Sequence, residues 1–377
     1  MRIGIITIQK SPASYGGNLQ AFALWRFLSN LGHDVEIIDL YRPAQEGYIN
    51  STNSLKYHTF TYNPSYSMTS VKAWITSLNP RGWLAQIRKK RFFQKMREFA
   101  AQARYSRPYF SVDDLYNNPP AYDLLISGSD QIWNKDMKFE MAPYFLDFAK
   151  DCRKISYASS FGQSTFDESY KAQIKQWLSN YECVSVRENS GVELLDSLGI
   201  KSSLVLDPTF LLSSEEWLKQ VEINKANKPF IMLFTLYNSE RVLESVRIIA
   251  KEMNLEVYSN KPYKDFRCIA DISVNKWLGY INSSSIVITD SFHATTFSII
   301  FKKNIYSLVV DNADSSKRST RLVNLLGLIN LQDHLINENS IEMIPSISAV
   351  NYSMVDAILE SVITESQQFL HSVLAHE

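Results

Sequence analysis

The sequence predicts an α/β protein with two doubly wound domains that face one cleft. Two observations predict this class. Strands and helices alternate along the first part of the chain, and the alternation begins again after a polar stretch at 224–228. The length of 377 residues also suits two or three domains of roughly 150 residues each. We expect a first domain over 1–222, a second over 223–350, and a C-terminal helix over 351–377 that packs back on the first domain.

The first domain begins with a βαβ unit. Arg2 to Ile8 is typical of a strand, Asn18 to Leu31 of a helix with one apolar stripe, and Val35 to Leu40 of a second strand, which must run parallel to the first. Asn18 is the expected N-cap of that helix, and Gly32 ends it. Further elements of this domain are expected at 122–127, 155–160, 184–186 and 204–206 (strands) and at 213–220 (a surface helix).

A long excursion from the sheet is expected over 45–110. The part from 45 to 80 is rich in Tyr, Ser, Asn and Thr and has no clear period. From Arg81 to Arg107, nine Lys and Arg accompany one acid, Glu98, and apolar residues recur at helical spacing. This pattern predicts a basic amphipathic helix. Such a helix could lie on an anionic membrane surface, or it could be an ordinary solvated helix.

The second domain follows from the second alternation. Its expected strands are 229–237, 255–259, 285–289 and 305–310, and its expected helices are 239–253 and 292–301. The last helix of the chain is expected at about 353–374.

Composition excludes several classes of protein. The 39 Lys and Arg balance 39 Asp and Glu, which disfavours non-sequence-specific binding of nucleic acid. Three cysteines, 31 and 85 residues apart, form neither a disulfide framework nor a zinc ribbon, and we expect no metal and no cofactor. The apolar run from Ile3 to Ile8 is too short for a signal peptide, and no stretch approaches the roughly 20 apolar residues of a spanning helix. We expect a cytoplasmic protein that could contact the inner face of the membrane peripherally.

The first candidate site lies between the first strand and the first helix. Gly16 and Gly17 could let a ligand approach the backbone, and the amides around Asn18 could attract an anion. The alternative is a plain tight turn. The segment lacks the GxGxxG pattern of dinucleotide-binding proteins, although Asp39 ends the second strand near the expected ribose position.

The second candidate is Asp130, in a polar segment that follows a predicted strand. Its carboxylate could accept a proton from a sugar hydroxyl. Alternatively, Asp130 caps a helix and Trp133 lies in the core.

The third candidate joins a strand to a helix at 289–295. His293 falls in the first turn of that helix, after Asp290 and Ser291. Helix amides and the helix dipole favour a phosphate there, and a bound dianion would favour a protonated imidazole. A single histidine is nevertheless more often structural than functional.

Three arginines form the fourth candidate set. Arg187 directly follows a strand, and Arg318 and Arg321 precede an apolar segment. Guanidinium groups bind carboxylates and phosphates through paired hydrogen bonds. A salt bridge from Arg187 to Glu188 or to another acid is the alternative.

These residues, taken together, resemble the polysaccharide pyruvyl transferase family over nearly the whole chain. The motifs that carry the resemblance are 16–24 (GGNLQAFAL), 127–134, 156–162, 186–188, 206–209, 290–294 and 318–328. The resemblance implies two Rossmann-like domains of the GT-B glycosyltransferase architecture. It also implies transfer of pyruvate from phosphoenolpyruvate onto two hydroxyls of a sugar as a ketal, with release of phosphate, in bacterial surface polysaccharide biosynthesis.

The resemblance and the candidate loops together suggest roles for the site residues. We expect His293 to bind the donor phosphate and protonate it as it leaves, and Asp130 to activate the acceptor hydroxyl. Many family members have an Arg two residues before the motif His and a Gly after it, where this chain has Ser291 and Ala294. The further expected donor ligands are Arg187, Ser291, and Arg318 or Arg321, of which one of the last two would replace the missing cation. The acceptor side or its loops would include Gly16, Gly17, Asn18 and Asp290.

Other functions are consistent with the same residues. The same two-domain architecture would suit a glycosyltransferase that uses a nucleotide sugar, and a non-catalytic sugar-binding module is the rival from another class. A dinucleotide oxidoreductase is disfavoured by the absence of GxGxxG. The acceptor sugar, which could be a lipid-linked oligosaccharide, is not encoded in any motif.

Overall fold

Two parallel sheets, one of seven strands and one of six, organise the chain. The computed structural model describes residues 1–10, 14–43, 45, 48–49, 80–137, 139–224, 226, 228–237, 239–309 and 313–375, without the side chains of 80–83, 85 and 313–318. Most of the excursion expected over 45–80 therefore lies outside the described residues. The chain forms two units, Met1–Leu211 with Ser366–Glu377, and Leu212–Glu365. Each is described by itself below.

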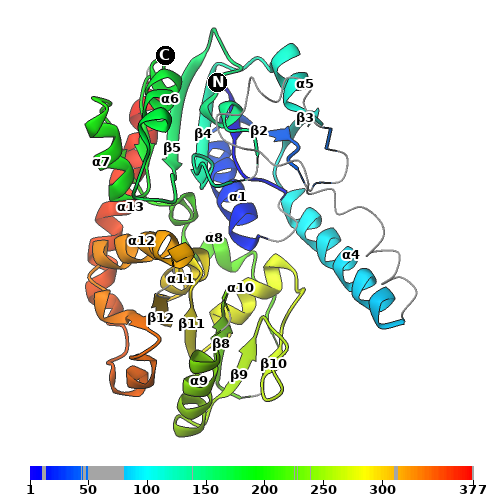
Figure 1. Ribbon diagram of the computed structural model, residues 1–377, viewed down its shortest axis with the longest axis vertical. Coiled ribbons are helices and arrows are strands. Elements are labelled where there is room, and N and C mark those ends of the chain that lie inside the picture. The colour runs from blue at the N-terminus through cyan, green and yellow to red at the C-terminus, as the bar shows by residue number, and fades with distance from the viewer. Residues whose placement is uncertain are drawn as a thin grey trace. The chain divides into compact units, whose positions relative to one another are not determined.

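The first unit contains a doubly wound sheet with the strand order β3-β2-β1-β4-β5-β6-β7. Its strands are β1 (Arg2–Ile6), β2 (Asp34–Leu40), β3 (Tyr105–Tyr109), β4 (Leu124–Asp130), β5 (Arg153–Ser159), β6 (Ser185–Val186) and β7 (Ser203–Leu204). Its helices are α1 (Tyr15–Asn30), α4 (Pro80–Ala100), α5 (Val112–Asn117), α6 (Glu168–Leu178) and α7 (Asn189–Ser197), with 3-10 turns η1 (Ala142–Phe145) and η2 (Pro208–Leu211) (Figure 1). The strand order reverses between β1 and β4, which is where sheets of this kind bind ligands, at the carboxyl ends of the strands.

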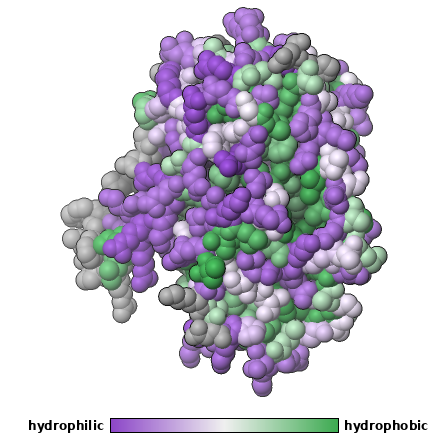
Figure 2. All heavy atoms as spheres, turned by 180° about the vertical axis from the view of Figure 1, so that it is seen from behind, coloured by the Kyte–Doolittle hydropathy of each residue, from purple (hydrophilic) through white to green (hydrophobic). Residues whose placement is uncertain are grey.

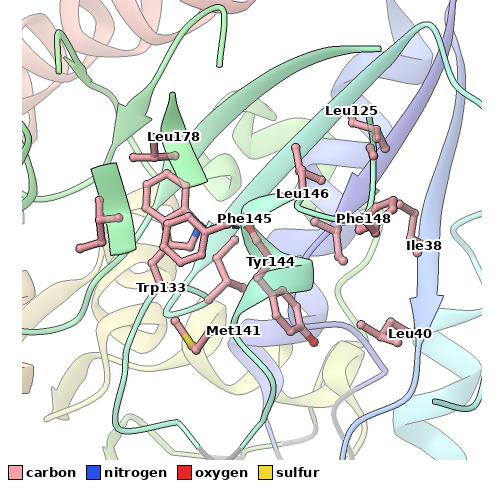
Figure 3. Close-up of a cluster of buried hydrophobic side chains, with 14 of the residues drawn as sticks. Ile38, Leu40, Leu125, Trp133, Met141, Tyr144, Phe145, Leu146, Phe148 and Leu178 are labelled. Carbon is pink, nitrogen blue, oxygen red and sulfur yellow. Dashed lines mark hydrogen bonds between the residues drawn. The ribbon is translucent and has the colours of Figure 1, made fainter. Parts of the chain in front are cut away.

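The core of the first unit is built on aromatic side chains that follow β4. Trp133 is fully buried and stacks on Phe145, with ring centroids 4.8 Å apart (Figure 3). Its indole Nε1 donates a hydrogen bond to the Tyr144 carbonyl at 3.1 Å. Phe145 in turn stacks on Trp177 of α6 at 4.5 Å. The core position considered for Trp133 is confirmed, and the polar residues before it are fixed to a rigid support.

The second unit contains six parallel strands in the order β10-β9-β8-β11-β12-β13. The strands are β8 (Phe230–Phe234), β9 (Glu256–Ser259), β10 (Arg267–Cys268), β11 (Ile286–Thr289), β12 (Asn304–Val309) and β13 (Leu335–Asn337). The helices are α8 (Ser214–Leu218), α9 (Glu240–Glu252), α10 (Val274–Ser283), α11 (Phe292–Ile300), α12 (Ala313–Leu328) and α13 (Tyr352–Leu374), with 3-10 turns η3 (Gln332–His334) and η4 (Ile341–Ser346).

The segment before β8 packs within the second unit. Trp217 of α8 lies edge-on against Phe297 of α11 at 4.8 Å. Farther along, the Glu222 amide donates to the Asn275 carbonyl at 3.0 Å, and a side chain on Gly279 would meet the Glu222 carbonyl oxygen at 2.0 Å. Because of these contacts, the segment from Leu212 onward belongs to the second unit, whereas we expected the first domain to extend to 222.

The end of α13 belongs to the first unit from Ser366 onward. The Ser366 hydroxyl accepts a hydrogen bond from the Leu206 amide at 2.9 Å, and Arg153 donates to the Val373 carbonyl at 2.6 Å. The long C-terminal helix was expected from the sequence. Within the described residues, no helix is both long enough and apolar enough to cross a bilayer.

Two local expectations are wrong. The first helix begins at Tyr15, because Ser14 and not Asn18 is its N-cap: the Ser14 hydroxyl accepts a hydrogen bond from the Gly17 amide at 3.1 Å. The basic helix ends at Ala100 instead of continuing to Arg107, because 105–109 forms the edge strand β3 beside β2.

Candidate functional site

A buried arginine lies at the carboxyl edge of the first sheet. The Arg187 side chain follows β6 and is 1% exposed. Its Nη1 is 2.5 Å from Asp207 Oδ2, its Nη2 is 3.1 Å from Asp130 Oδ1, and its Nε is 3.9 Å from Glu188 Oε2. We call these four residues the arginine cluster. Three carboxylates and one guanidinium give the cluster a formal charge of −2.

Backbone and hydroxyl groups hold the carboxylates of the arginine cluster in place. Asp207 Oδ1 accepts hydrogen bonds from the Thr209 amide at 3.1 Å and hydroxyl at 2.8 Å. Glu188 Oε1 accepts from the Ser160 hydroxyl and the Gly162 amide at 2.8 and 2.9 Å. The motif segments 127–134, 156–162, 186–188 and 206–209 therefore converge on one network.

Burial and the neighbouring acids act in opposite directions on Arg187. Desolvation is the largest influence and lowers its pKa, but the carboxylates of Asp207, Asp130 and Glu188 outweigh it, so that the pKa of Arg187 is raised. The guanidinium is therefore charged and bound to acids of its own chain. This is the salt-bridge alternative considered for Arg187, with two acids beyond Glu188.

Asp130 is the member of the arginine cluster that reaches the surface. Its side chain is 13% exposed, against 0 or 1% for the other three members. Its φ angle of 71° is in the left-handed region, which is costly for a residue other than Gly and is often found at functional sites. Asp130 Oδ1 accepts from the Gln131 amide at 2.9 Å, and a turn follows where a helix had been the alternative. The ion pair with buried Arg187 and the hydrogen bond from the Gln131 backbone amide hold the Asp130 carboxylate in place.

The Gly16 to Asn18 segment lies in the first turn of α1 and is buried. Gln20 of the same helix donates hydrogen bonds to the Thr7 hydroxyl and the Gly17 carbonyl, both at 2.9 Å. The Thr7 hydroxyl in turn donates to the Ser129 carbonyl at 2.8 Å. The start of α1 is thus linked by hydrogen bonds to the end of β4, beside Asp130.

A second set of charged residues lies in the first unit, and sequence reasoning did not find it as a set. Lys10 Nζ is 2.5 Å from the buried Asp39 carboxylate and 4.2 Å from the centre of the Tyr105 ring. Arg42 is also buried, and its Nη2 donates to the Gln9 carbonyl at 2.7 Å. Burial, with a smaller effect of Asp39, raises the pKa of Tyr105, and Arg42 opposes the rise. The position of Asp39 at a strand end was the available signal, but Lys10 and Arg42 follow no pattern.

In the second unit, polar residues surround the start of α11. Ser291 is the N-cap, and its hydroxyl accepts from the Ala294 amide. His293 is 8% exposed and lies edge-on against the Phe292 ring at 5.2 Å. Arg321 of α12 is 5.5 Å from the centre of that ring. Arg321 thus lies near the helix start, whereas the Arg318 side chain is outside the described residues.

Asp290 fastens the loop after β8 to the start of α11. Its carboxylate accepts hydrogen bonds from the Leu236 and Tyr237 amides at 2.7 and 3.0 Å. Burial raises the pKa of Asp290, and these amides oppose the rise. Lys261 donates to the Tyr237 carbonyl at 2.8 Å, and burial lowers its pKa against the effect of Asp290. Lys261 is a second cation at this site that the sequence did not indicate.

A pocket of about 820 Å³ elsewhere in the second unit contains none of these residues. Apolar side chains such as Ile336, Met343 and Val355 form much of its lining. Its His334 is bound through Nδ1 to the Ile305 carbonyl at 2.9 Å, and burial lowers the pKa of the imidazole. The pocket offers no set of catalytic groups comparable with the arginine cluster.

The structure places the candidate residues in two groups. Asp130 and Arg187 meet in the first unit, with the start of α1 linked to them. Ser291, His293 and Arg321 gather in the second unit beside Asp290. The first group offers an oriented carboxylate, and the second offers amides, an imidazole and cations suited to an anion.

Comparisons with solved structures show the fold. A crystal structure of a UDP-N-acetylglucosamine 2-epimerase aligns over 100% of this chain and 97% of its own, with 10% identity and a TM-score of 0.51. The epimerase from Neisseria meningitidis bound to UDP-GlcNAc covers 98% and 100%, with 10% identity and a TM-score of 0.46. A glycosyltransferase from Streptomyces sp. SF2575 complexed with thymidine diphosphate covers 98% and 96%, with 12% identity and a TM-score of 0.44. The chain has a GT-B-like α/β fold, as expected.

No curated protein matches the chain in sequence. The family model described as polysaccharide pyruvyl transferase matches residues 15–312. This span begins at α1 and includes both the arginine cluster and the start of α11. The chain therefore belongs to the polysaccharide pyruvyl transferase family.

Proposed function

We propose that the protein transfers pyruvate from phosphoenolpyruvate onto two hydroxyls of one sugar, forming a cyclic ketal and releasing phosphate, in bacterial surface polysaccharide biosynthesis. The observation that carries the proposal is the arginine cluster. Four motif segments converge there, at the carboxyl edge of a doubly wound sheet, and present one strained, partly exposed carboxylate. Family membership supplies the reaction class.

The donor site that we propose is the start of α11. Phosphoenolpyruvate carries a phosphate and a carboxylate, so its site needs cations or free amides for both. The amides of the first helical turn, His293 and Arg321 are close enough in the fold to supply them. Lys261 adds a positive charge beside Asp290. Arg321 would then replace the cation that Ser291 does not provide. Donor binding by Arg318 stays a prediction.

The acceptor side that we propose is centred on Asp130. The arginine cluster has a formal charge of −2, which repels an anionic donor but can take a proton from a neutral sugar hydroxyl. In this role Arg187 is a positioning residue, because it holds Asp130 through a 3.1 Å ion pair. Direct binding of the donor by Arg187 stays a prediction, and the three surrounding carboxylates favour the positioning role.

The reaction proceeds by addition and then elimination. A sugar hydroxyl attacks C2 of phosphoenolpyruvate and gives its proton to Asp130, while C3 gains a proton and becomes a methyl group. Over the whole reaction, the two hydroxyl protons of the sugar balance the proton gained by C3 and the proton gained by the phosphate. The C2–O bond to phosphate then breaks, and His293 protonates the departing phosphate. A second hydroxyl of the same sugar attacks the oxocarbenium-like C2 and loses its proton, which closes the ketal ring. One sugar and one phosphoenolpyruvate thus give one ketal and one phosphate.

Substitution at the two sites tests this division of roles. We expect His293→Gln and Asp130→Asn each to slow phosphate release at least about 100-fold, the usual range for loss of a proton-transfer group. His293→Gln should also raise KM for phosphoenolpyruvate, whereas Asp130→Asn should leave it unchanged. The controls are His371→Gln and Asp333→Asn, which alter exposed side chains and should turn over normally. Turnover of His293→Gln near that of the unaltered protein would remove the proposed donor site.

A panel of candidate acceptors can identify the substrates directly. Incubation with phosphoenolpyruvate and glycosides that have free 4- and 6-hydroxyls should give products with the added mass of a pyruvate ketal. Thermal unfolding separates the rival donors, since a ligand at 100 times its Kd stabilises the folded protein by about 2.7 kcal/mol. Stabilisation by nucleotide sugars but not by phosphoenolpyruvate would favour a glycosyltransferase. Stabilisation by sugars without phosphate release would favour a binding module.

A further inference from the structure

Helix α4 is anchored to the first unit along its second half. Phe92, Met96 and Phe99 are buried there. Phe92 lies edge-on against Tyr15 at 6.0 Å, and Phe99 packs on Phe22 at 5.3 Å, so that α4 is held against α1. From 84 to 91 the described side chains are exposed or half-buried, and this half extends away from α1 (Figure 1).

Positive charge is concentrated on α4. The helix contains one acid, Glu98, and seven basic residues: Arg81, Arg88, Lys89, Lys90, Arg91, Lys95 and Arg97. The formal charge of α4 is therefore +6, and because the whole chain is neutral, the rest of it carries −6. Seen from behind, the projecting helix is largely hydrophilic (Figure 2). The charge is local to one helix and is not a property of the whole surface.

Apolar side chains lie among these cations on the exposed face. Leu84 is 49% exposed, and Ile87 is half-buried. Helical spacing places Leu84, Ile87, Arg88 and Arg91 on one side of α4, in the rows that lead at four-residue steps to the buried Phe92 and Phe99. Exposure of Leu84 to water contributes no hydrophobic stabilisation to the folded chain. This arrangement is typical of helices that lie in the interface of an anionic bilayer.

We propose that α4 binds the surface of anionic membranes. Arg88, Lys90 and Arg91 contact lipid phosphates, and Leu84 and Ile87 enter the boundary between headgroups and acyl chains. Charge complementarity selects this occupant, because a helix of charge +6 on a neutral chain fits a surface of dense negative charge. Vesicle binding requires no turnover, so its failure would leave the proposed pyruvyl transfer untouched.

The test is partitioning of the full-length chain into lipid vesicles. We expect binding to phosphatidylcholine vesicles that contain phosphatidylglycerol, weak binding to pure phosphatidylcholine, and release at high salt. Each basic residue near such a surface contributes about fivefold to the partition constant. Arg88→Gln combined with Arg91→Gln should therefore bind roughly 25-fold more weakly. The matched control, Lys150→Gln with Lys201→Gln, removes two exposed cations outside α4 and should bind normally.

Two further variants complete the test. Leu84→Ser should weaken binding without any change of charge, since it removes the apolar contact. Lys89→Gln with Lys90→Gln repeats the charge test at other exposed positions of the same half of α4 if the first pair proves unfolded by circular dichroism. The proposal fails if pure phosphatidylcholine binds equally well, or if the control pair loses as much affinity as the α4 pair. It also fails if duplex DNA, tested with the same variants, binds more tightly than the anionic vesicles.

Discussion

Replacing Arg187 by Met would remove the cation from the centre of the arginine cluster. The methionine fills a similar volume, but it leaves Asp207 with no cation at 2.5 Å and Asp130 with none at 3.1 Å. Removal of one partner from a buried ion pair typically costs about 3 to 5 kcal/mol, because the remaining charge is buried without compensation. We expect a loss of this size in the free energy of unfolding of the first unit.

The loss should depend on pH with a definite sign. Without the guanidinium, burial raises the pKa of the Asp207 carboxyl in the folded variant above its unfolded value of about 4. Between the unfolded pKa and the raised folded pKa of Asp207, the folded variant binds more protons than the unfolded chain. The stability of the variant therefore falls as the pH rises through this range. The difference from the unaltered protein should therefore shrink as the pH is lowered toward about 4.

Urea denaturation followed by tryptophan fluorescence would measure this effect at several pH values. Arg104→Met is the matched control: its guanidinium is 57% exposed beside Asp34, and such surface pairs contribute about 1 kcal/mol or less. Combining Arg187→Met with Asp207→Asn should cost less than the sum of the two single changes, because both act on one network. A loss below about 1 kcal/mol for Arg187→Met, or a loss that grows on acidification, would refute the reasoning.

Two further predictions concern backbone geometry. Gly162 has a φ of 63°, and a β-carbon there would lie 2.4 Å from the side-chain amide nitrogen of Gln131. We therefore expect Gly162→Ala to lower the free energy of unfolding, measured by thermal unfolding, by clearly more than about 1 kcal/mol. Gly199→Ala is its control, since φ is 73° but nothing lies within 4 Å; equal losses for the two variants would mean that the contact with Gln131 is unimportant. Ser14→Ala removes the N-cap of α1 and should cost about 1 kcal/mol. An unchanged melting temperature for Ser14→Ala would show that the cap contributes nothing.

The sequence predicted the sheets better than their edges. Central strands such as β8 and β11 are buried on both faces and therefore appear as nearly continuous apolar segments. The edge strand β3 was missed because Arg107 and Pro108 interrupt its pattern. The strands expected at 184–186 and 204–206 are present as β6 and β7, with two residues each. Helix α6 could have been found, since Asp167 caps a helix whose buried residues recur at four-residue spacing.

The candidate site was predicted residue by residue but not as a network. Local patterns placed Asp130 and Arg187 at strand ends, where parallel sheets bind ligands. They could not show that Arg187 binds Asp130 and Asp207, because these contacts span 57 and 20 residues of sequence and depend on the order of strands. Lys261 likewise reaches Tyr237 only through the packing of the second sheet.

The arginine cluster also constrains how related sequences can diverge. Four chain segments contribute side chains or amides to a single charge balance, and one of them, 186–188, contributes both Arg187 and Glu188. A neutral residue at 187 would therefore remove the cation that the carboxylates at 130, 188 and 207 share. Homologues should therefore retain all four positions together or exchange them together. A relative that lacks Arg at 187 should have a cation from another element in its place, or neutral residues in place of the acids.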